Sequence, residues 1–115
     1  MGGKQIKVEP SNLGYTTISG GQTKTLNLSS DMDNYSFLIA QGYTGSTMLA
    51  QMYIPIAYFK GGNAFRLSYA DTSYVYWWDV TYSSDTAVKV HAFGGWPAST
   101  TLSFRILGIK ETVDI

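Results

Sequence analysis

The chain has 115 residues, and its eight Lys and Arg balance eight Asp and Glu, so its formal net charge is zero. Charged residues make up only 14% of the chain, against a usual fraction of about 25%. A neutral, charge-poor chain lacks the basic surface that binds nucleic acids or anionic membranes, so we expect neither partner. The absence of cysteine excludes disulfides, thiolate metal sites and a cysteine nucleophile.

Length and hydrophobic content predict one folded domain over residues 1–115. Hydrophobic residues make up 44% of the chain, and a mass of 12.7 kDa leaves room for a single core. No apolar run reaches the about 18 residues of a membrane-spanning helix, and the N-terminus lacks the apolar core of a signal peptide. Residues 1–3 are compatible with a remnant of cloning or with a fragment of a longer chain. Residues 111–115 are interpreted as a C-terminal tail.

Apolar and polar residues alternate with a period of two along most of the chain, which is typical of half-buried β-strands. In chain order, the alternating segments are residues 25–28, 35–39, 64–69, 74–82, 87–93 and 100–109. In the second segment, Tyr35, Phe37 and Ile39 share one face. Turn signals such as Gly20-Gly21 and Ser83-Ser84-Asp85 separate the segments. The pattern predicts an all-β, antiparallel, jelly-roll-like β-sandwich with eight or nine strands and essentially no helix.

The segment that comes nearest to a helix is Thr47–Lys60. Pro55 lies within it, and most of its second half consists of aromatic and β-branched residues that favour strand. We therefore expect a strand to about Ile54, followed by an irregular bend or a second short strand.

The sequence offers little for catalysis. Histidine occurs once, at His91, on the strand face opposite Val88 and Val90, and no Gly-x-Ser-x-Gly motif accompanies it. A glycosidase needs two carboxylates about 5–10 Å apart, whereas most acidic residues here lie at turns or termini. We expect a protein without enzymatic activity.

Asp31-Met32-Asp33-Asn34 resembles the opening of a calcium-binding loop. An EF-hand loop then requires glycine at its sixth position and glutamate at its twelfth, where this chain has Ser36 and Gly42. The segment is interpreted as a turn between strands. The sequence predicts neither a metal site nor a cofactor.

The strand over residues 74–82 carries bulky side chains on both faces. A sandwich strand buries only one face in its own core, so the other must meet a partner subunit, a ligand or a covering loop. We select Tyr76, Trp77 and Trp78 as candidates for an interface between copies of the chain, which we expect to form a trimer.

Aromatic residues in turns are the candidates for ligand contact. Trp96 lies in a Gly-Gly-Trp-Pro loop and Tyr43 in a Gln-Gly-Tyr-Thr-Gly segment, where each could project outward or plug the core. Tyr74 completes the aromatic set, and Asp71 and Asp79 are candidate acceptors for ligand hydroxyls. Flat aromatic rings beside polar groups suit sugars and protein partners alike. The zero net charge favours a neutral or weakly charged glycan.

The segment Leu102–Lys110 resembles the last strand of C-terminal head domains in phage and prophage tail-fibre proteins. Residues 35–40 and the proline-containing segment 48–59 also fit that pattern, and the resemblance covers residues 23–110. It implies a receptor-binding tip, usually trimeric, that recognises a bacterial surface glycan or protein. It carries over no binding residues, and the His-x-His iron pairs of some needle-like tips are absent.

Three functions remain open at this point. The first is an adhesion module located on the virion and released by host lysis. The second is a structural virion or appendage protein, such as a baseplate or decoration jelly roll, whose aromatic residues serve assembly. The third, a small glycan-degrading enzyme, is disfavoured because acids and histidine are scarce.

Overall fold

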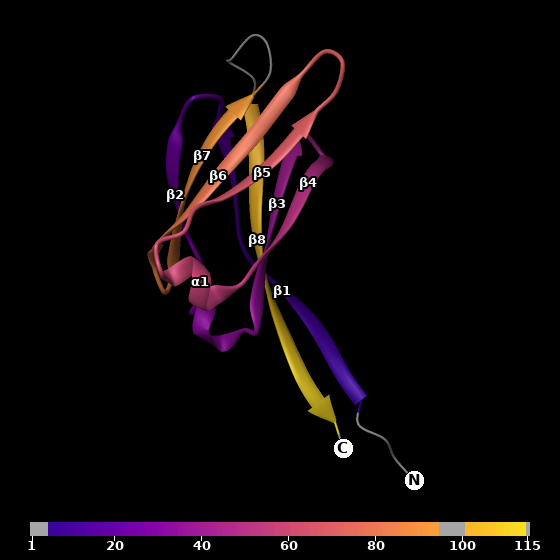
Figure 1. Ribbon diagram of the computed structural model, residues 1–115, viewed down its shortest axis with the longest axis vertical. Coiled ribbons are helices and arrows are strands. Elements are labelled where there is room, and N and C mark those ends of the chain that lie inside the picture. The colour runs from indigo at the N-terminus through magenta and orange to yellow at the C-terminus, as the bar shows by residue number, and fades with distance from the viewer. Residues whose placement is uncertain (1–4, 95–100, 115) are drawn as a thin grey trace.

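The computed structural model describes residues 5–94 and 101–114, and Figure 1 shows these as two antiparallel sheets packed face to face. Sheet 1 has the strand order β1-β8-β3-β4, and sheet 2 has the order β2-β7-β6-β5. The strands are β1 (Gln5–Ser19), β2 (Thr23–Asn27), β3 (Phe37–Thr44), β4 (Thr47–Ile54), β5 (Phe65–Ala70), β6 (Val75–Ser84), β7 (Ala87–Gly94) and β8 (Thr101–Asp114). The predicted all-β sandwich is confirmed.

The order of pairing places strands from the two ends of the chain side by side. β1 pairs with β8 and β2 pairs with β7, as first and last strands do in a jelly roll. β3 with β4 and β5 with β6 instead form local hairpins. As a result, β8 lies between β1 and β3, so its side chains have neighbours from two strands of the first half of the chain.

The core lies between the sheets and follows the alternation in the sequence. Leu102, Phe104 and Ile106 of β8 face inward, and so do Val88, Val90 and Ala92 of β7. The segment 35–39 differs, because Leu38 and Ala40 are fully buried while Phe37 and Ile39 are half-buried on the outer face. Both faces of this strand are apolar, so the alternation alone does not say which face is the core.

The segment after β4 corrects a prediction. Residues expected as a bend or a short strand form a one-turn helix, α1 (Ile56–Lys60). Pro55 occupies the N-cap position, where its lack of a backbone N–H costs nothing, and its carbonyl accepts from Phe59 N at 3.0 Å. The turn buries the Phe59 side chain completely, which favours the helix over an extended chain. A 3₁₀ turn, η1 (Met32–Asn34), precedes β3.

A two-stranded arm projects from the sandwich (Figure 1). It consists of residues 5–9 of β1 paired with residues 110–114 of β8. Residues 111–114, which we interpreted as part of a C-terminal tail, form the end of β8. The radius of gyration is 15.5 Å, against about 13 Å for a compact domain of this length, and the longest dimension is 59 Å. Within the described ranges, neither helical segment could cross a membrane.

Candidate functional site

The described part of the chain encloses no pocket, and the predicted ligand contacts that it contains lie on open surfaces. The predicted site residues are distributed over three such places. Tyr43 lies on the outer face of sheet 1, Asp79 and Trp77 lie on the outer face of sheet 2, and Asp71 and Tyr74 lie at the β5–β6 turn. Asp79 and Tyr43 are therefore on opposite sides of the sandwich. The four predicted ligand contacts that the structure describes, Tyr43, Asp71, Tyr74 and Asp79, do not form one site.

Trp96, the leading candidate in the sequence, lies outside the described residues. The candidate site must therefore be built from the remaining aromatic residues.

Tyr43 belongs to a cluster on the outer face of sheet 1. Strand register places Arg105 of β8 directly between Tyr15 of β1 and Gln41 of β3, and it places Gln41 opposite Gln51 of β4. Tyr43 lies two residues beyond Gln41 on the same outer face. We call Tyr15, Gln41, Tyr43, Gln51 and Arg105 the tyrosine–arginine site.

The Arg105 guanidinium lies over both tyrosine rings. Its central carbon is 5.3 Å from the ring centroid of Tyr15 and 5.5 Å from that of Tyr43. The two rings meet edge to face, with centroids 6.5 Å apart and an interplanar angle of 67°. Cation–π attraction acts at such distances, so the rings hold the guanidinium in place.

A row of hydrogen bonds crosses the site from β8 to β4. Arg105 Nη1 donates to the Tyr43 hydroxyl at 3.4 Å, and that hydroxyl donates to Gln41 Oε1 at 2.9 Å. Gln41 Nε2 then donates to Gln51 Oε1 at 2.8 Å. Gln41 is only 9% exposed, so the row fixes a nearly buried amide. The three bonds run in one direction, from β8 through two residues of β3 to β4. The row therefore begins at the Arg105 guanidinium and ends at the exposed Gln51 side-chain amide.

Arg105 has no carboxylate partner among the described residues. Its Nε is buried without a hydrogen-bond acceptor, and its Nη2 makes no hydrogen bond within the described chain. The other described arginine, Arg66, is different. Its Nε and Nη2 donate to the two oxygens of Asp79 at 2.7 and 2.8 Å, and this contact raises the pKa of Arg66.

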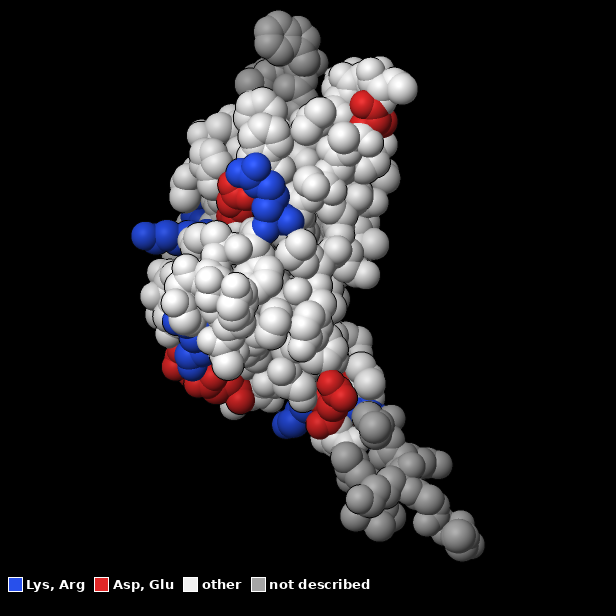
Figure 2. Space-filling view, viewed as in Figure 1, with Lys and Arg blue, Asp and Glu red and all other residues white. Residues whose placement is uncertain are grey.

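Asp79 is thus engaged by Arg66, on an outer face of sheet 2 that also carries Trp77. The indole stacks on Phe93 with centroids 4.0 Å apart and an interplanar angle of 11°, and Arg66 lies 5.0 Å from its ring centroid. Figure 2 shows few charged side chains on this side of the molecule, in separate groups with uncharged surface between them. Both oxygens of Asp79 are thus paired with Arg66.

Asp71 organises the β5–β6 turn. Its carboxylate accepts from the backbone N–H groups of Ser73 and Tyr74 at 2.7 and 2.8 Å, and from the Tyr69 hydroxyl at 3.0 Å. The bond from Ser73, followed by those from Tyr74 and Tyr69, lowers the pKa of Asp71. Tyr74 is 45% exposed and stacks on Tyr76 with centroids 6.0 Å apart. Asp71 is therefore a turn cap, whereas Tyr74 stays accessible.

Trp78 corrects the predicted interface. Its side chain is 0% exposed and lies in the core between the sheets, so it cannot contact a partner subunit. The alternation along β6 turns Trp78 inward and Trp77 outward. Tyr76 is half-buried at the edge of the core and stacks on Trp78 with centroids 6.5 Å apart.

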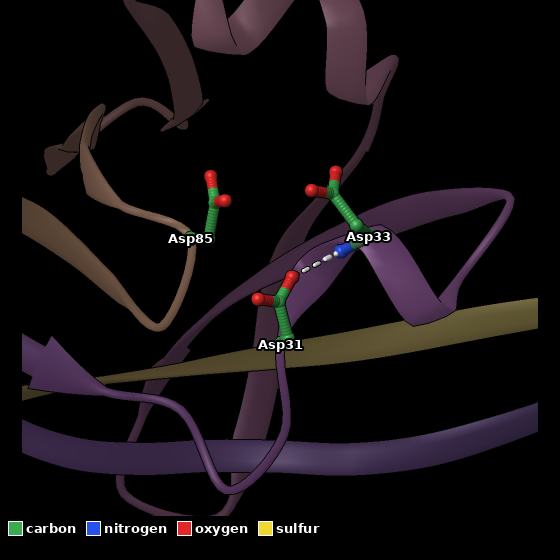
Figure 3. Close-up of side chains that lie close together, drawn as sticks. All are labelled: Asp31, Asp33 and Asp85. Carbon is green, nitrogen blue, oxygen red and sulfur yellow. Dashed lines mark hydrogen bonds between the residues drawn. The ribbon is translucent and has the colours of Figure 1, made fainter.

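An acidic cluster lies at the end of the sandwich near α1. Carboxylate oxygens of Asp31, Asp33 and Asp85 all lie within 4.8 Å of one another (Figure 3). The Asp31 side chain accepts from the backbone N–H of Asp33 at 2.8 Å and so caps η1.

Lys60 supplies the positive charge of this cluster. Its Nζ lies 2.8 Å from Asp33 and 2.9 Å from Asp85, and these bonds raise the pKa of Lys60. The Tyr82 hydroxyl also donates to Asp85 at 2.6 Å. Lys60 thus pairs with two of the three carboxylates, and residues 32–34 form the turn η1 between β2 and β3. The one histidine, His91 on β7, is half-buried, and its Nδ1 lies 2.8 Å from the Thr23 hydroxyl.

Sequence reasoning missed Tyr15, Arg105 and both glutamines. The only available signal was the outward position of Arg105 in the alternating segment 100–109. Its neighbours come from β1 and β3, and the sequence does not show that β8 lies between these strands.

Comparison with family models, with curated proteins and with solved structures gave no match to this chain.

Proposed function

We propose that the chain is a non-enzymatic adhesion module, the receptor-binding tip of a phage tail fibre, which recognises a bacterial surface glycan or protein. The observation that supports this function best is the tyrosine–arginine site on an open sheet face. It combines aromatic rings with an arginine that has no carboxylate partner among the described residues, and no pocket encloses it. Such a surface suits the contact of an extended partner better than the enclosure of a small substrate.

The contacts of the acidic residues support a non-enzymatic role. Asp71 caps a turn, Asp79 binds Arg66, and Asp33 and Asp85 bind Lys60. Acid–base catalysis needs carboxylates that can reach a substrate. Each of these carboxylates is instead held by a neighbour in the same chain.

The outer face of sheet 2 supports self-association, which we propose gives a trimer in the virion. The stacked pair of Trp77 and Phe93 lies beside Val75, which is largely exposed. An apolar surface of this kind is commonly covered by a partner subunit. Burying this face would leave the tyrosine–arginine site free on the other sheet.

Adsorption to cells tests the proposed function. We would measure binding of the fluorescently labelled chain to a panel of bacterial strains, after treating the cells with periodate or with protease. We expect binding to at least one strain. Loss after periodate identifies a glycan receptor, and loss after protease identifies a protein receptor.

A double variant, Tyr15→Ala with Tyr43→Ala, should reduce adsorption at least about 10-fold, because aromatic anchors carry much of the energy of such contacts. The matched control is Tyr58→Ala, which removes an exposed tyrosine on α1. Equal loss in the control, or no adsorption by any strain, would contradict the proposal.

A structural virion protein is the second candidate, and the projecting arm favours it. The arm extends a two-stranded ribbon away from the sandwich, and Phe37 and Tyr53 present aromatic rings 4.7 Å apart on the outer face of sheet 1. Both features could pack against other virion subunits. Assembly of the chain without any cell adsorption would favour this candidate.

A further inference from the structure

We infer, on the basis of the proposed adhesion function, that the tyrosine–arginine site binds the carboxylate of an acidic sugar, of the uronic acid class. The sequence favoured a neutral or weakly charged glycan because the net charge is zero. The Arg105 guanidinium, however, has no carboxylate partner among the described residues.

The contrast between the two described arginines carries the argument. Arg66 already holds a carboxylate through two hydrogen bonds. Arg105 is held in a fixed position by two tyrosine rings, yet its only described hydrogen bond is a long one of 3.4 Å to a neutral hydroxyl. A guanidinium binds carboxylates with planar, paired hydrogen bonds, so a pre-positioned and unpaired one suits this ligand group.

The rest of the site suits the remainder of a sugar. Tyr15 is 46% exposed and offers an apolar ring beside the guanidinium. Gln51, two strands away from Arg105, is exposed and uses its carbonyl oxygen for Gln41, which leaves its amide N–H groups for ligand hydroxyls. Adjacent strands lie about 4.8 Å apart, so the guanidinium and this amide are roughly 10 Å apart across the sheet. A carboxylate and a hydroxyl of one short oligosaccharide could engage both ends.

A sugar carboxylate fits better than a phosphate group. Arg105 is the one cation in the hydrogen-bonded row, and its neighbours in the row are a tyrosine and two glutamines. A phosphate carries more charge and is usually bound by several cations or by a helix N-terminus. One guanidinium matches a group of single negative charge.

The test compares oligogalacturonate with the same oligosaccharide after methyl esterification, which removes the charge and keeps the sugar. Titration calorimetry on the full chain should show binding of the acid form and at least about 10-fold weaker binding of the ester, since a hydrogen bond to a charged group is stronger than one to a neutral group. Inorganic phosphate and an acetylated peptide with a free C-terminal carboxylate are the competing anions. Neither should displace the oligosaccharide at equal concentration.

Variants assign the effect to the site. Arg105→Gln should weaken binding of oligogalacturonate at least about 10-fold, and Tyr43→Phe should weaken it less. Lys110→Gln removes an exposed charge from the same strand and should leave binding unchanged. Arg105→Lys keeps the charge and the aliphatic stem, so this variant should be folded and should still bind weakly. Melting curves of both variants show whether a loss of binding by Arg105→Gln comes from a folding defect.

Outcomes separate the inference from the function on which it rests. Equal binding of acid and ester, or unchanged binding by Arg105→Gln, overturns the acidic-sugar inference even if cells still adsorb the chain. Displacement by phosphate or by the peptide overturns it in favour of that anion. Absence of adsorption to any cell overturns the adhesion function itself.

Discussion

The indole of Trp78 occupies the space in which Gly42 would carry a side chain. A Cβ built on Gly42 would lie 2.6 Å from two atoms of the Trp78 ring, closer than Cβ atoms in proteins approach a neighbouring group. β3 and β6 belong to different sheets, so this contact fixes how closely the two sheets approach at this point. Gly42 also lies next to Tyr43, so the same contact positions the β3 end of the tyrosine–arginine site.

Gly42→Ala should therefore destabilise the fold. The added methyl group must push a fully buried indole, and overpacking of a core costs about 1–3 kcal/mol. Chemical denaturation should show this loss as a lower midpoint. The control is Gly45→Asn in the following turn, where nothing lies within 4 Å and asparagine tolerates the left-handed conformation at φ +56°. A control variant as unstable as Gly42→Ala would contradict the role of the Trp78 contact.

The two adjacent tryptophans should differ sharply in their contribution to stability. Trp78→Ala should cost about 3–5 kcal/mol, because it leaves a cavity in the core, whereas Trp77→Ala removes a half-buried surface stack and should cost about 1 kcal/mol. Trp78→Phe should cost less than Trp78→Ala, because it keeps a ring and removes an indole N–H that is buried without a partner. Equilibrium unfolding of the three variants measures these differences. Equal losses for the two alanine variants would refute the assignment of Trp78 to the core.

Stability should decrease in acid because the Asp85 carboxylate is held in its charged form. Bonds from Tyr82 and then from Lys60 lower the pKa of Asp85 below its ordinary value. A group whose pKa is lower in the folded state stabilises the protein above its unfolded pKa and loses this contribution as the pH falls through the folded value. Melting temperature should therefore decline below about pH 4.

Asp85→Asn should lower the melting temperature at pH 7 and reduce the decline between pH 5 and pH 2.5. Glu9→Gln, on the exposed arm, is the control and should keep the full decline. An Asp85→Asn variant with the same pH profile as the unchanged chain would contradict a role for the Lys60–Asp85 pair.

The chain should sediment as a trimer of about 38 kDa, three times its mass of 12.7 kDa. Trp77→Lys should dissociate it at micromolar concentration, because it places a charge in the proposed interface on sheet 2. Tyr53→Lys, on the outer face of sheet 1, should leave the trimer intact. Sedimentation equilibrium measures both. A monomer of the unchanged chain, or dissociation by Tyr53→Lys alone, would contradict the proposed interface.

Much of the architecture could be predicted from alternation. Leu102, Phe104 and Ile106 face inward as the period of two indicates, and Val88 and Val90 do likewise. The segment 35–39 could not be resolved in this way, because Leu38 and Ile39 are both apolar. α1 was missed because a single turn is stabilised by the burial of Phe59, which local propensity does not register.

The candidate site could be predicted only one residue at a time. Tyr43 was selected as an aromatic residue in a turn, and its partners Arg105 and Tyr15 are distant in the chain. Asp79 was selected as a ligand acceptor because it lies among aromatic residues. Its cross-strand partner Arg66 neutralises it, and only the register of β5 with β6 reveals this pairing.

The sequence by itself determined the class of fold, the neutral charge and the absence of cysteine chemistry, because composition and a period of two are local properties of a chain. Tertiary structure decided which arginine is paired and which is free. Arg66 and Arg105 each lie on an outward strand face, and nothing local distinguishes them. The strand beside Arg66 brings a carboxylate, whereas the strands beside Arg105 bring tyrosine and glutamine side chains, so strand order leaves the Arg105 guanidinium without a carboxylate partner among the described residues.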